Sequence, residues 1–282
     1  MKTLVEFKRY LLRNKLSLVG FLLVNFILLV ALFAPWIAPS PKEGRGVENI
    51  DHIGFGPGWH HWMGTDILGR DVLSRVIYGA RPALLIAICV VLVAATVGTI
   101  LGLVAGYMGG WIDEVIMRVC DLFLSFPPLL LALVAVSLLG PGLTHAALAL
   151  VISWWPWYAR LVRGQAQSLK SRAFVEVASA MGVGTFTIVR RHIFRNVTTP
   201  LIIQAAADLG TVILAAGSLA FIGLGAQPPQ SDWGLMVADG RGLVFDQWWV
   251  ATFPGLAIFI TVLGFNLLGD GMRDFLDPRS QK

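Results

Sequence analysis

Charged side chains are scarce in this chain. Only 14% of its 282 residues are Asp, Glu, Lys or Arg, whereas 56% are hydrophobic. A soluble domain carries roughly 25% charged residues, so this composition excludes an ordinary water-soluble protein. Uncharged runs approach or exceed the roughly 20 apolar residues that a helix needs to cross a bilayer. The segments of about ten residues with alternating polarity that a membrane β-barrel needs are missing. The sequence therefore predicts an all-α integral membrane protein.

Six membrane-spanning helices are predicted from the apolar runs. They are Leu16–Ala38, Ala83–Met108, two helices within Leu122–Ala159, Val197–Leu224 and Val250–Gly269. Leu122–Ala159 is too long for one span, and Gly140–Gly142 is expected to divide it into the third and fourth spans. The second span carries small residues at steps of four, namely Ala94, Gly98, Gly102 and Gly106. These residues predict a smooth face on which a neighbouring helix approaches closely, and a gating hinge is the alternative.

Lys and Arg gather on one side of these spans. With six spans both termini share a side, and most of the 22 basic residues fall there, before the first span, between the fourth and fifth, and at the C-terminus. The side rich in Lys and Arg faces the cytoplasm, so both termini are expected to be cytoplasmic. These residues lie at membrane edges rather than on a face with stacking aromatics, so no nucleic-acid partner is expected.

Cysteines and catalytic motifs are nearly absent. Cys89 and Cys120 are isolated, so neither a disulfide framework nor a cysteine metal site is predicted. His60 and His61 are adjacent, which is a poor geometry for two metal ligands, and both are interpreted as surface residues. No G-x-x-x-x-G-K-[ST] phosphate loop, no H-E-x-x-H and no G-x-S-x-G occurs. The chain is therefore expected to bind no metal or cofactor and to hydrolyse no ATP itself.

The chain is expected to form one membrane domain, with no soluble part large enough to fold alone. Its parts are a basic N-terminal segment (1–15), the first helix with a long outer loop (16–81), a core transmembrane domain (82–272) and a tail (273–282). The longest polar segment on the inner side is 160–196. This segment is the first place to look for contacts with other proteins.

One part of this inner segment, residues 176–194, reads EVASAMGVGTFTIVRRHIF. A short helix is predicted from Lys170 to Met181, followed by a glycine turn at Gly182, and Thr185 can cap a second helix. Small residues make the first helix thin, and it carries one carboxylate. Such a helix suits a groove on another protein, but an amphipathic linker lying on lipid headgroups fits these residues equally well.

The same segment resembles the cytoplasmic signature of ABC-importer permeases, which is Glu-Ala-Ala, three residues, Gly. Glu176, Ala178 and Gly182 match it, with valine in place of the first alanine, and the sequence departs from the family pattern after the turn. The resemblance implies that the short helix, with Val175 and Met181 as apolar contacts, docks into a groove on an ATPase subunit. It also implies the six-helix architecture of type I importers, with ATP and Mg bound by two such ATPase partners.

Three further stretches resemble permeases of the dipeptide, oligopeptide and nickel subfamily, in particular the second, C-type permease. They are MGTDILGRDVLSRVIYGAR (63–81), FIGLGAQPPQSDWGLMVADGR (221–241) and FNLLGDGMRDFLDPR (265–279). The resemblance implies an outer mouth that receives an extracytoplasmic substrate-binding protein. The residues concerned are Gly64, Thr65, Asp66, Gly69, Arg70 and Asp71. A purely structural clamp is the alternative, in which Thr65 or Asp66 caps a short helix and Arg70 pairs with Asp71.

Asp208 is the only charged residue inside the fifth span, LIIQAAADLGTVIL. A carboxylate at bilayer depth is costly, and it usually faces a cavity or a partner. Two roles stay open. Asp208 either lies on the translocation path, where it would meet the α-amino group of a peptide, or forms hydrogen bonds in packing against a neighbouring permease.

Together with the predicted spans, the resemblance thus implies a multi-pass, non-enzymatic permease subunit of a bacterial inner-membrane importer. It would form half of a pathway for di- or oligopeptides beside a second homologous permease, driven through the inner loop. One alternative keeps this machine and changes the cargo to nickel or a metal chelate. Another is a gradient-driven secondary transporter, which would need buried charges in several spans and inverted repeats. An intramembrane enzyme would need a nucleophile–base pair, and the sequence offers none.

Overall fold

The structure is a computed structural model that describes residues 10–276. Several basic residues on which the predicted orientation depends, such as Lys2, Lys8, Arg279 and Lys282, lie outside the described residues. Within residues 10–276 the only extended pairing is an isolated antiparallel bridge between Thr65 and Asp71 in the outer loop. The predicted all-helical architecture is confirmed.

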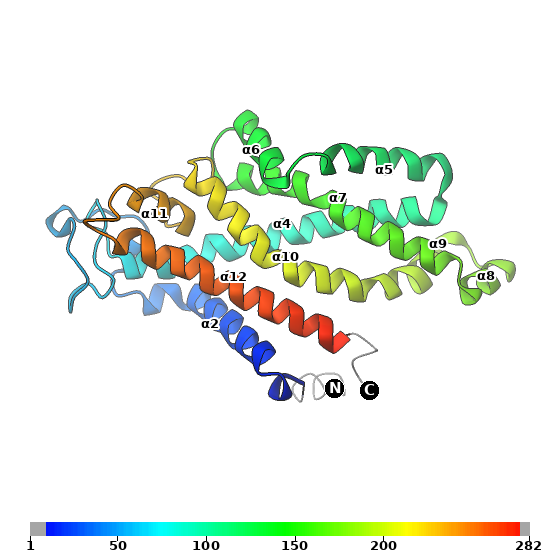
Figure 1. Cartoon of the computed structure of the whole chain (residues 1–282), viewed down its shortest axis with the longest axis horizontal. Helices are drawn as coiled ribbons and strands as arrows, with labels where there is room; N and C mark the ends of the chain where they lie inside the picture. The colour runs from blue at the N-terminus through cyan, green and yellow to red at the C-terminus, as the bar shows by residue number, and fades with distance from the viewer. Residues whose placement is uncertain (1–9, 277–282) are drawn as a thin grey trace.

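Seven helices of twelve or more residues build the described part of the bundle. They are α2 (Lys15–Ile37), α4 (Val72–Met108), α5 (Gly110–Leu124), α6 (Pro128–Leu139), α7 (Leu143–Lys170), α10 (Arg195–Phe221) and α12 (Trp249–Leu276). Shorter elements connect them, namely α3 (Pro41–Gly44), η1 (Ile50–His52), α8 (Ala173–Ala180), α9 (Thr185–Ile188), the π-helical η2 (Val189–Phe194) and α11 (Trp233–Gly240). Figure 1 shows an elongated bundle with the 39–71 loop and α11 at one end and α8 and α9 at the other.

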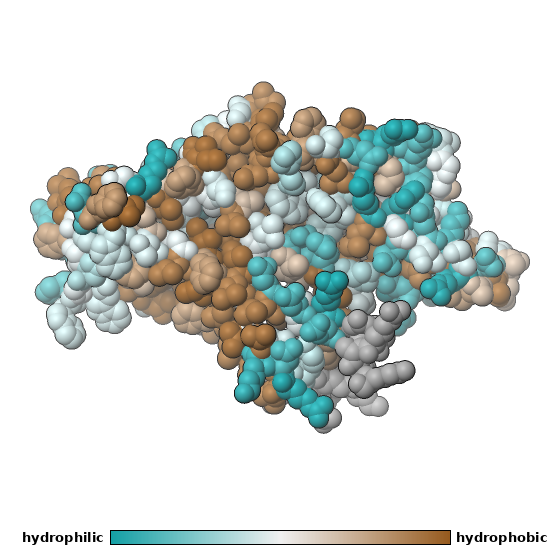
Figure 2. Space-filling model, viewed as in Figure 1, coloured by the Kyte–Doolittle hydropathy of each residue, from teal (hydrophilic) through white to brown (hydrophobic). Residues whose placement is uncertain are grey.

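Six units of this bundle correspond to the six predicted spans. Three helices, α2, α4 and α12, and the helical run Thr185–Phe221 are each long and apolar enough to cross a bilayer. The pair α5–α6 passes the same test as one span bent by 88°. The sixth unit, α7, is apolar over Leu143–Ala159 and polar beyond it. Figure 2 shows hydrophobic surface across the middle of the bundle and hydrophilic surface toward the end that carries α8.

The third span differs from its prediction. It was expected to begin at Leu122, whereas α5 already begins at Gly110 and ends at Leu124. Pro127 and Pro128 follow, and because proline has no N–H to continue a helix, the chain turns there before α6 starts. The start of α2 and the end of α12 lie close together, with the rings of Tyr10 and Phe275 5.5 Å apart. Both described ends therefore share one side of the bundle.

The small-residue face of α4 packs tightly on α7. A Cβ built on Gly102 would lie 2.5 Å from the carbonyl oxygen of Ala159, and one built on Gly106 would lie 2.7 Å from Cβ of Ala166. Such distances leave no room for a side chain, so the predicted close approach of a neighbouring helix is confirmed. The central hydrophobic core continues from this contact to α10 and α12.

The C-terminal end of α2 is attached to α4 by an arginine. Pro35 lies inside α2 and has no N–H, so the carbonyl of Ala31, four residues earlier, loses its helical donor. Arg81 on α4 supplies the missing donor, because its Nε lies 2.7 Å from the Ala31 oxygen. Its Nη2 also donates to the carbonyl of Leu32 at 3.2 Å. Arg81 of α4 thus supplies the hydrogen bond that Pro35 removes from α2.

Candidate functional site

The inner loop is built on α8, which is fixed to the bundle by one buried side chain. The helix expected from Lys170 to Met181 is divided, because α7 ends at Lys170 and α8 starts at Ala173. Val175 is 3% exposed and packs in a cluster with Val162 of α7 and Ile193 of η2. Val175 therefore faces inward and anchors α8, whereas the sequence places it among the docking contacts.

The other faces of α8 are open. Glu176 is exposed and Ala178 is half-buried against the same cluster. Val177 is 58% exposed, Met181 78%, and Phe186 of α9 75%. Sequence reasoning missed Val177 and Phe186, because a helix of eight residues is too short for its period to reveal the buried face. One carboxylate with three apolar side chains thus faces away from the chain.

Gly182 ends this helix in a left-handed turn. Its φ is +79°, and a Cβ built there would meet no atom within 4 Å. Glycine adopts this conformation freely, whereas most side chains make it cost about 1–2 kcal/mol. Thr185, expected to cap the next helix, is instead its first residue, and Gly184 holds the cap position without a side-chain hydrogen bond. The turn leaves open space where another protein can approach the backbone.

A cavity of about 800 Å³ lies between α8 and the adjoining ends of α4 and α7. Its lining includes Tyr107, Gln167, Lys170, Ser171, Glu176 and Ser179. Lys170 donates from Nζ to the carbonyl of Tyr107 at 2.6 Å and lies 5.3 Å from the centre of its ring. The cavity therefore presents both charges and several hydroxyl groups beside the exposed face of α8.

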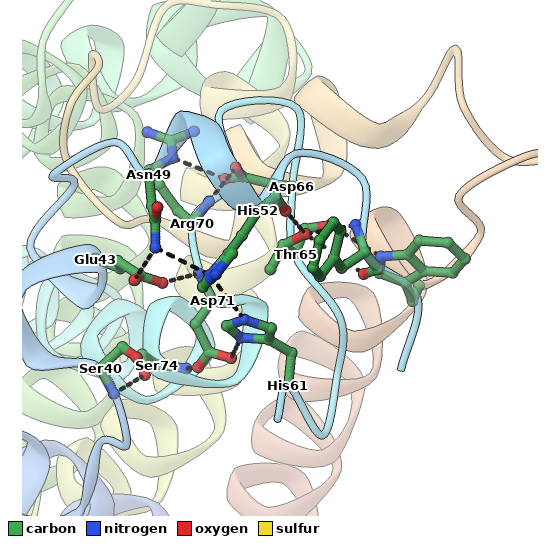
Figure 3. Close-up of polar contacts among 12 residues, drawn as sticks. Ser40, Glu43, Asn49, His52, His61, Thr65, Asp66, Arg70, Asp71 and Ser74 are labelled. Atoms are coloured by element: carbon green, nitrogen blue, oxygen red, sulfur yellow. Dashed lines mark hydrogen bonds and ion pairs between the residues drawn. The ribbon is translucent and has the colours of Figure 1, made fainter. Parts of the chain in front are cut away.

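In the 39–71 loop, the buried carboxylate of Asp66 holds two arginines. Its Oδ2 accepts from Nε of Arg70 at 2.7 Å (Figure 3) and its Oδ1 accepts from the backbone N–H of Arg70 at 2.9 Å. The same Oδ2 also accepts from Nη1 of Arg75, on α4, at 2.6 Å. Asp66 is fully buried, and both arginines are at most 3% exposed. Arg70 therefore pairs with Asp66, and the predicted pairing with Asp71 is wrong.

Asp71 has a different task, because it joins the loop to the start of α4. Its Oδ2 accepts from the N–H of Ser74 at 2.8 Å, so Asp71 caps α4, and the predicted caps at Thr65 and Asp66 are wrong. Its Oδ1 lies 3.0 Å from Nδ1 of His61. His61 is 7% exposed, so its interpretation as a surface residue is also wrong. A further hydrogen-bond chain extends through His52, Asn49 and Glu43 (Figure 3).

Two glycines let the loop fold back on itself. Gly64 and Gly69 have φ near +70°, and side chains at these positions would collide with Trp249 and with the backbone of Asn49. The carbonyl of Thr65 accepts from Nε1 of Trp249 at 2.9 Å, which ties the loop to α12. All six sequence-predicted mouth residues thus belong to one folded unit, and the four with polar side chains are buried in it.

This unit also holds α11. Asp239 on α11 lies 3.8 Å from both Arg70 and Arg75, and Asp232 caps the helix by accepting from the N–H of Leu235 at 3.0 Å. Burial raises the pKa of the Asp239 carboxyl, while the two arginines oppose the rise. Burial likewise raises the pKa of Asp232. Two segments far apart in sequence therefore meet in one ion cluster.

Asp208 lies inside the chain, between α7 and α10. It is 8% exposed, and its Oδ1 accepts from Nε2 of Gln204 at 3.0 Å. Tyr158 of α7 lies beside the carboxyl group. Both neighbours belong to this chain, so a passing cargo would reach Asp208 only if these helices moved apart.

Within residues 10–276, no group of three or more His, Cys, Asp or Glu side chains is arranged to hold a metal ion. Cys89 and Cys120 are both free thiols. The candidate sites of the described chain are therefore surfaces and polar networks.

Comparisons with known proteins agree with this arrangement. Residues 98–282 match the family "Binding-protein-dependent transport system inner membrane component", and residues 3–52 match "N-terminal TM domain of oligopeptide transport permease C". A solved structure titled "Inward facing conformations of the MetNI methionine ABC transporter" shares the fold. Its TM-score is 0.59 at 18% identity, over 72% of this chain and 96% of that one.

Curated relatives are similar over nearly the whole chain. The probable D,D-dipeptide transport system permease protein DdpC of Escherichia coli K12 is 42% identical over 95% of this chain and 89% of its own length. The dipeptide transport system permease protein DppC of Alkalihalophilus pseudofirmus is 42% identical over 96% and 88%. The glutathione transport system permease protein GsiD of Escherichia coli is 44% identical over 97% and 90%. The chain therefore belongs to the binding-protein-dependent transport system inner membrane components, the multi-pass permease subunits of bacterial ABC importers.

Proposed function

We propose that this permease imports short peptides and forms half of the translocation pathway beside a second, related permease. The names of its relatives support the cargo, because two of the three act on dipeptides and the third acts on glutathione, itself a short peptide. Two ATPase subunits and an extracytoplasmic substrate-binding protein complete the complex. ATP and Mg are bound by the ATPases, and this chain contributes no catalytic residue. Both termini and α8 then face the cytoplasm.

The arrangement of α8 carries the proposal. The helix is anchored by Val175 on one side and presents Glu176, Val177 and Met181 on the other. A thin, exposed helix with apolar side chains around one carboxylate suits insertion into a groove of a partner protein. Gly182 leaves room for the partner at the end of the helix, because nothing in this chain lies within 4 Å of its missing side chain. In this proposal α8 is the point at which ATP-driven motion enters the permease.

The outer-loop unit shapes the mouth of the pathway. Its polar side chains are buried and bonded to one another, which supports the clamp alternative over direct contact with a binding protein. The clamp holds α11 and the start of α4 in a fixed relation through Asp66, Arg75 and Asp239. A binding protein would then meet a preformed rim whose exposed tips include Trp59 and Trp62, which are 96% and 72% exposed.

Two variants at Gly182 test the proposal. Gly182→Ala strains the left-handed turn but adds little bulk, whereas Gly182→Asn tolerates positive φ and adds a larger side chain. If an ATPase approaches this turn closely, both variants reduce uptake of a labelled dipeptide in cells, and the asparagine variant reduces it more. Gly164→Ala is the matched control, since that glycine lies within α7 with open space around it.

Co-purification of the ATPases with the permease provides the second readout. The Gly182 variants should lose bound ATPase while remaining inserted in the membrane. Normal uptake and normal ATPase binding in both variants would contradict a docking role for α8. Uptake that survives ATP depletion but collapses with the ion gradient would refute the ABC mechanism, and restored uptake of nickel instead of peptide would change the cargo alone.

A further inference from the structure

One face of α7, just before α8, reaches across to the turn between α4 and α5. Arg163, Gln167 and Lys170 recur at helical spacing, so they lie along one side of α7. Arg163 and Gln167 bind Asp113 in the first turn of α5, and Lys170 binds the backbone carbonyl of Tyr107 at the end of α4. Three side chains along one face of α7, the helix that leads into α8, thus hold both sides of this turn.

The contact with Asp113 is geometrically strong. Arg163 donates from Nε to Oδ1 at 2.9 Å and from Nη2 to Oδ2 at 2.6 Å, which is the two-pronged pairing in which arginine is most directional. Gln167 adds a bond from Nε2 to Oδ2 at 3.1 Å. Asp113 is 9% exposed, whereas the Arg163 side chain is 34% exposed, so the carboxylate is buried and its donor is partly open to solvent. The carboxylate therefore has three donors, all from α7.

The turn that these contacts span is built like a hinge. Gly109 and Gly110 are consecutive, have φ of +69° and +57°, and a side chain at either would meet nothing within 4 Å. The two glycines themselves therefore do not fix the angle between α4 and α5, which leaves that task to the contacts with α7. Beyond the hinge, α5 and α6 pack mainly on α4 and α7 (Figure 1). The position of this bent arm depends on what α7 does.

We propose that Asp113, Arg163 and Gln167 form a transmission clamp that makes the α5–α6 arm follow α7 when α8 is displaced. Arg163 and Gln167 are positioning residues in this scheme, and Asp113 is the point at which the arm is held. The proposal rests on the function proposed above, since it assumes that α8 receives the motion of an ATPase. It adds the element that carries that motion from α7 to the bent span.

The test uses the complete transporter with its partner permease, ATPases and binding protein in proteoliposomes. Asp113→Asn keeps the size of the side chain and removes the charge that Arg163 holds. We expect the ATPases to remain bound and to hydrolyse ATP, while dipeptide uptake per ATP falls about fivefold or more, the lower end of typical coupling between sites. A purely structural role would lower both activities together and leave their ratio unchanged.

Glu114→Gln is the matched control. Glu114 is adjacent on α5 and undergoes the same chemical change, but its partner Arg118 is on the same helix and both side chains are exposed. Its uptake per ATP should stay at the wild-type value. Arg163→Lys keeps the positive charge but loses the two-pronged contact, so its uptake per ATP should lie between those of the wild type and Asp113→Asn. If Asp113→Asn does not assemble, Arg163→Lys takes its place in the test.

Unchanged uptake per ATP in both clamp variants, or an equal loss in the Glu114 control, would overturn the proposal. Failure of the clamp is distinguishable from failure of the function it rests on. If α8 is not the docking helix, the Gly182 variants keep their ATPases. If only the clamp is wrong, the Gly182 variants lose ATPase binding while the Asp113 variant transports normally.

Discussion

Replacing Arg81 by alanine should loosen α2 from α4, and the effect should depend on Pro35. In the native chain the Ala31 carbonyl receives no helical N–H, since its partner position is Pro35, and it accepts from Arg81 instead. The site lies in the C-terminal third of α2, a helix long and apolar enough to cross a bilayer. An amide oxygen without a donor in such surroundings costs about 1–2 kcal/mol.

The second perturbation, Pro35→Ala, restores an N–H to the helix. The Ala31 carbonyl then has its own donor, so Arg81→Ala in this background should cost little. By the size scaling of unfolding entropies, a loss of about 1–2 kcal/mol in the native background should lower Tm by roughly 2–6 °C. In the Pro35→Ala background, Arg81→Ala should change Tm by only about 1 °C. A change of this size is within the error to which the effects of independent mutations add.

The four proteins of this double-mutant cycle can be compared by thermal unfolding in nanodiscs. Cys120 is fully buried, so after Cys89→Ser its reaction with a thiol dye reports unfolding. Arg118→Ala serves as a control because the Arg118 side chain is exposed and its ion-pair partner, Glu114, lies on the same helix. Equal losses from Arg81→Ala in both backgrounds would refute the reasoning, since they would show that Arg81 acts independently of the carbonyl that Pro35 frees.

Three further changes test the packing and the outer network. Gly102→Ala should destabilise the chain by about 1–3 kcal/mol, because the new methyl group meets the backbone of α7. Gly164→Ala should not destabilise it, because that glycine has open space around it. Thermal unfolding of both variants in nanodiscs tests this difference. Asp66→Asn should lower the free energy of unfolding by about 3–5 kcal/mol, because Arg70 and Arg75 stay buried and lose the carboxylate of Asp66. Glu48→Gln, at an exposed position, should leave Tm unchanged. Equal Tm values for the two variants would contradict the ion cluster. The raised pKa of Asp239 means that the folded chain holds this proton more tightly than the unfolded chain, so stability should fall as pH rises from about 4 through the raised value. Asp239→Asn should reduce that slope, measured as Tm between pH 4 and 7, and an unaltered slope would exclude Asp239 as its source.

The spans and the α4–α7 contact could be predicted from the sequence because their signals are local. A long apolar run has few alternatives to a spanning helix, and small residues at steps of four define a face whatever the neighbour is. The break between α5 and α6 could not be placed in the same way. The run is apolar on both sides of Pro127, and only the fold shows that α5 begins as early as Gly110.

The partners of the outer-loop residues could not be predicted, because they depend on how the chain reverses. Gly69, with its positive φ, turns Arg70 back onto Asp66, whereas sequence order suggested the neighbour Asp71. The same reversal brings Asp71 to His61, which is also covered by the rings of His52 and Phe55. On α8, similarly, Val175 and Val177 look alike in sequence, and the cluster formed with α7 and η2 decides which of them is buried.

Glycines with positive φ are packed differently in two parts of the molecule. In the 39–71 loop, Gly64 and Gly69 are wedged against other parts of the chain, beside a network of buried ion pairs. At the turns beside α5 and α8, Gly109, Gly110 and Gly182 have the same kind of backbone, and a Cβ built on any of them meets no described atom within 4 Å. In the function proposed here, force applied at α8 rocks the permease, and a rigid 39–71 loop would let a displacement at α8 become a rotation of whole helices. The close packing of α4 on α7 would make those two helices the lever, and in the proposed clamp the contacts of Asp113 would decide whether the α5–α6 arm moves with it.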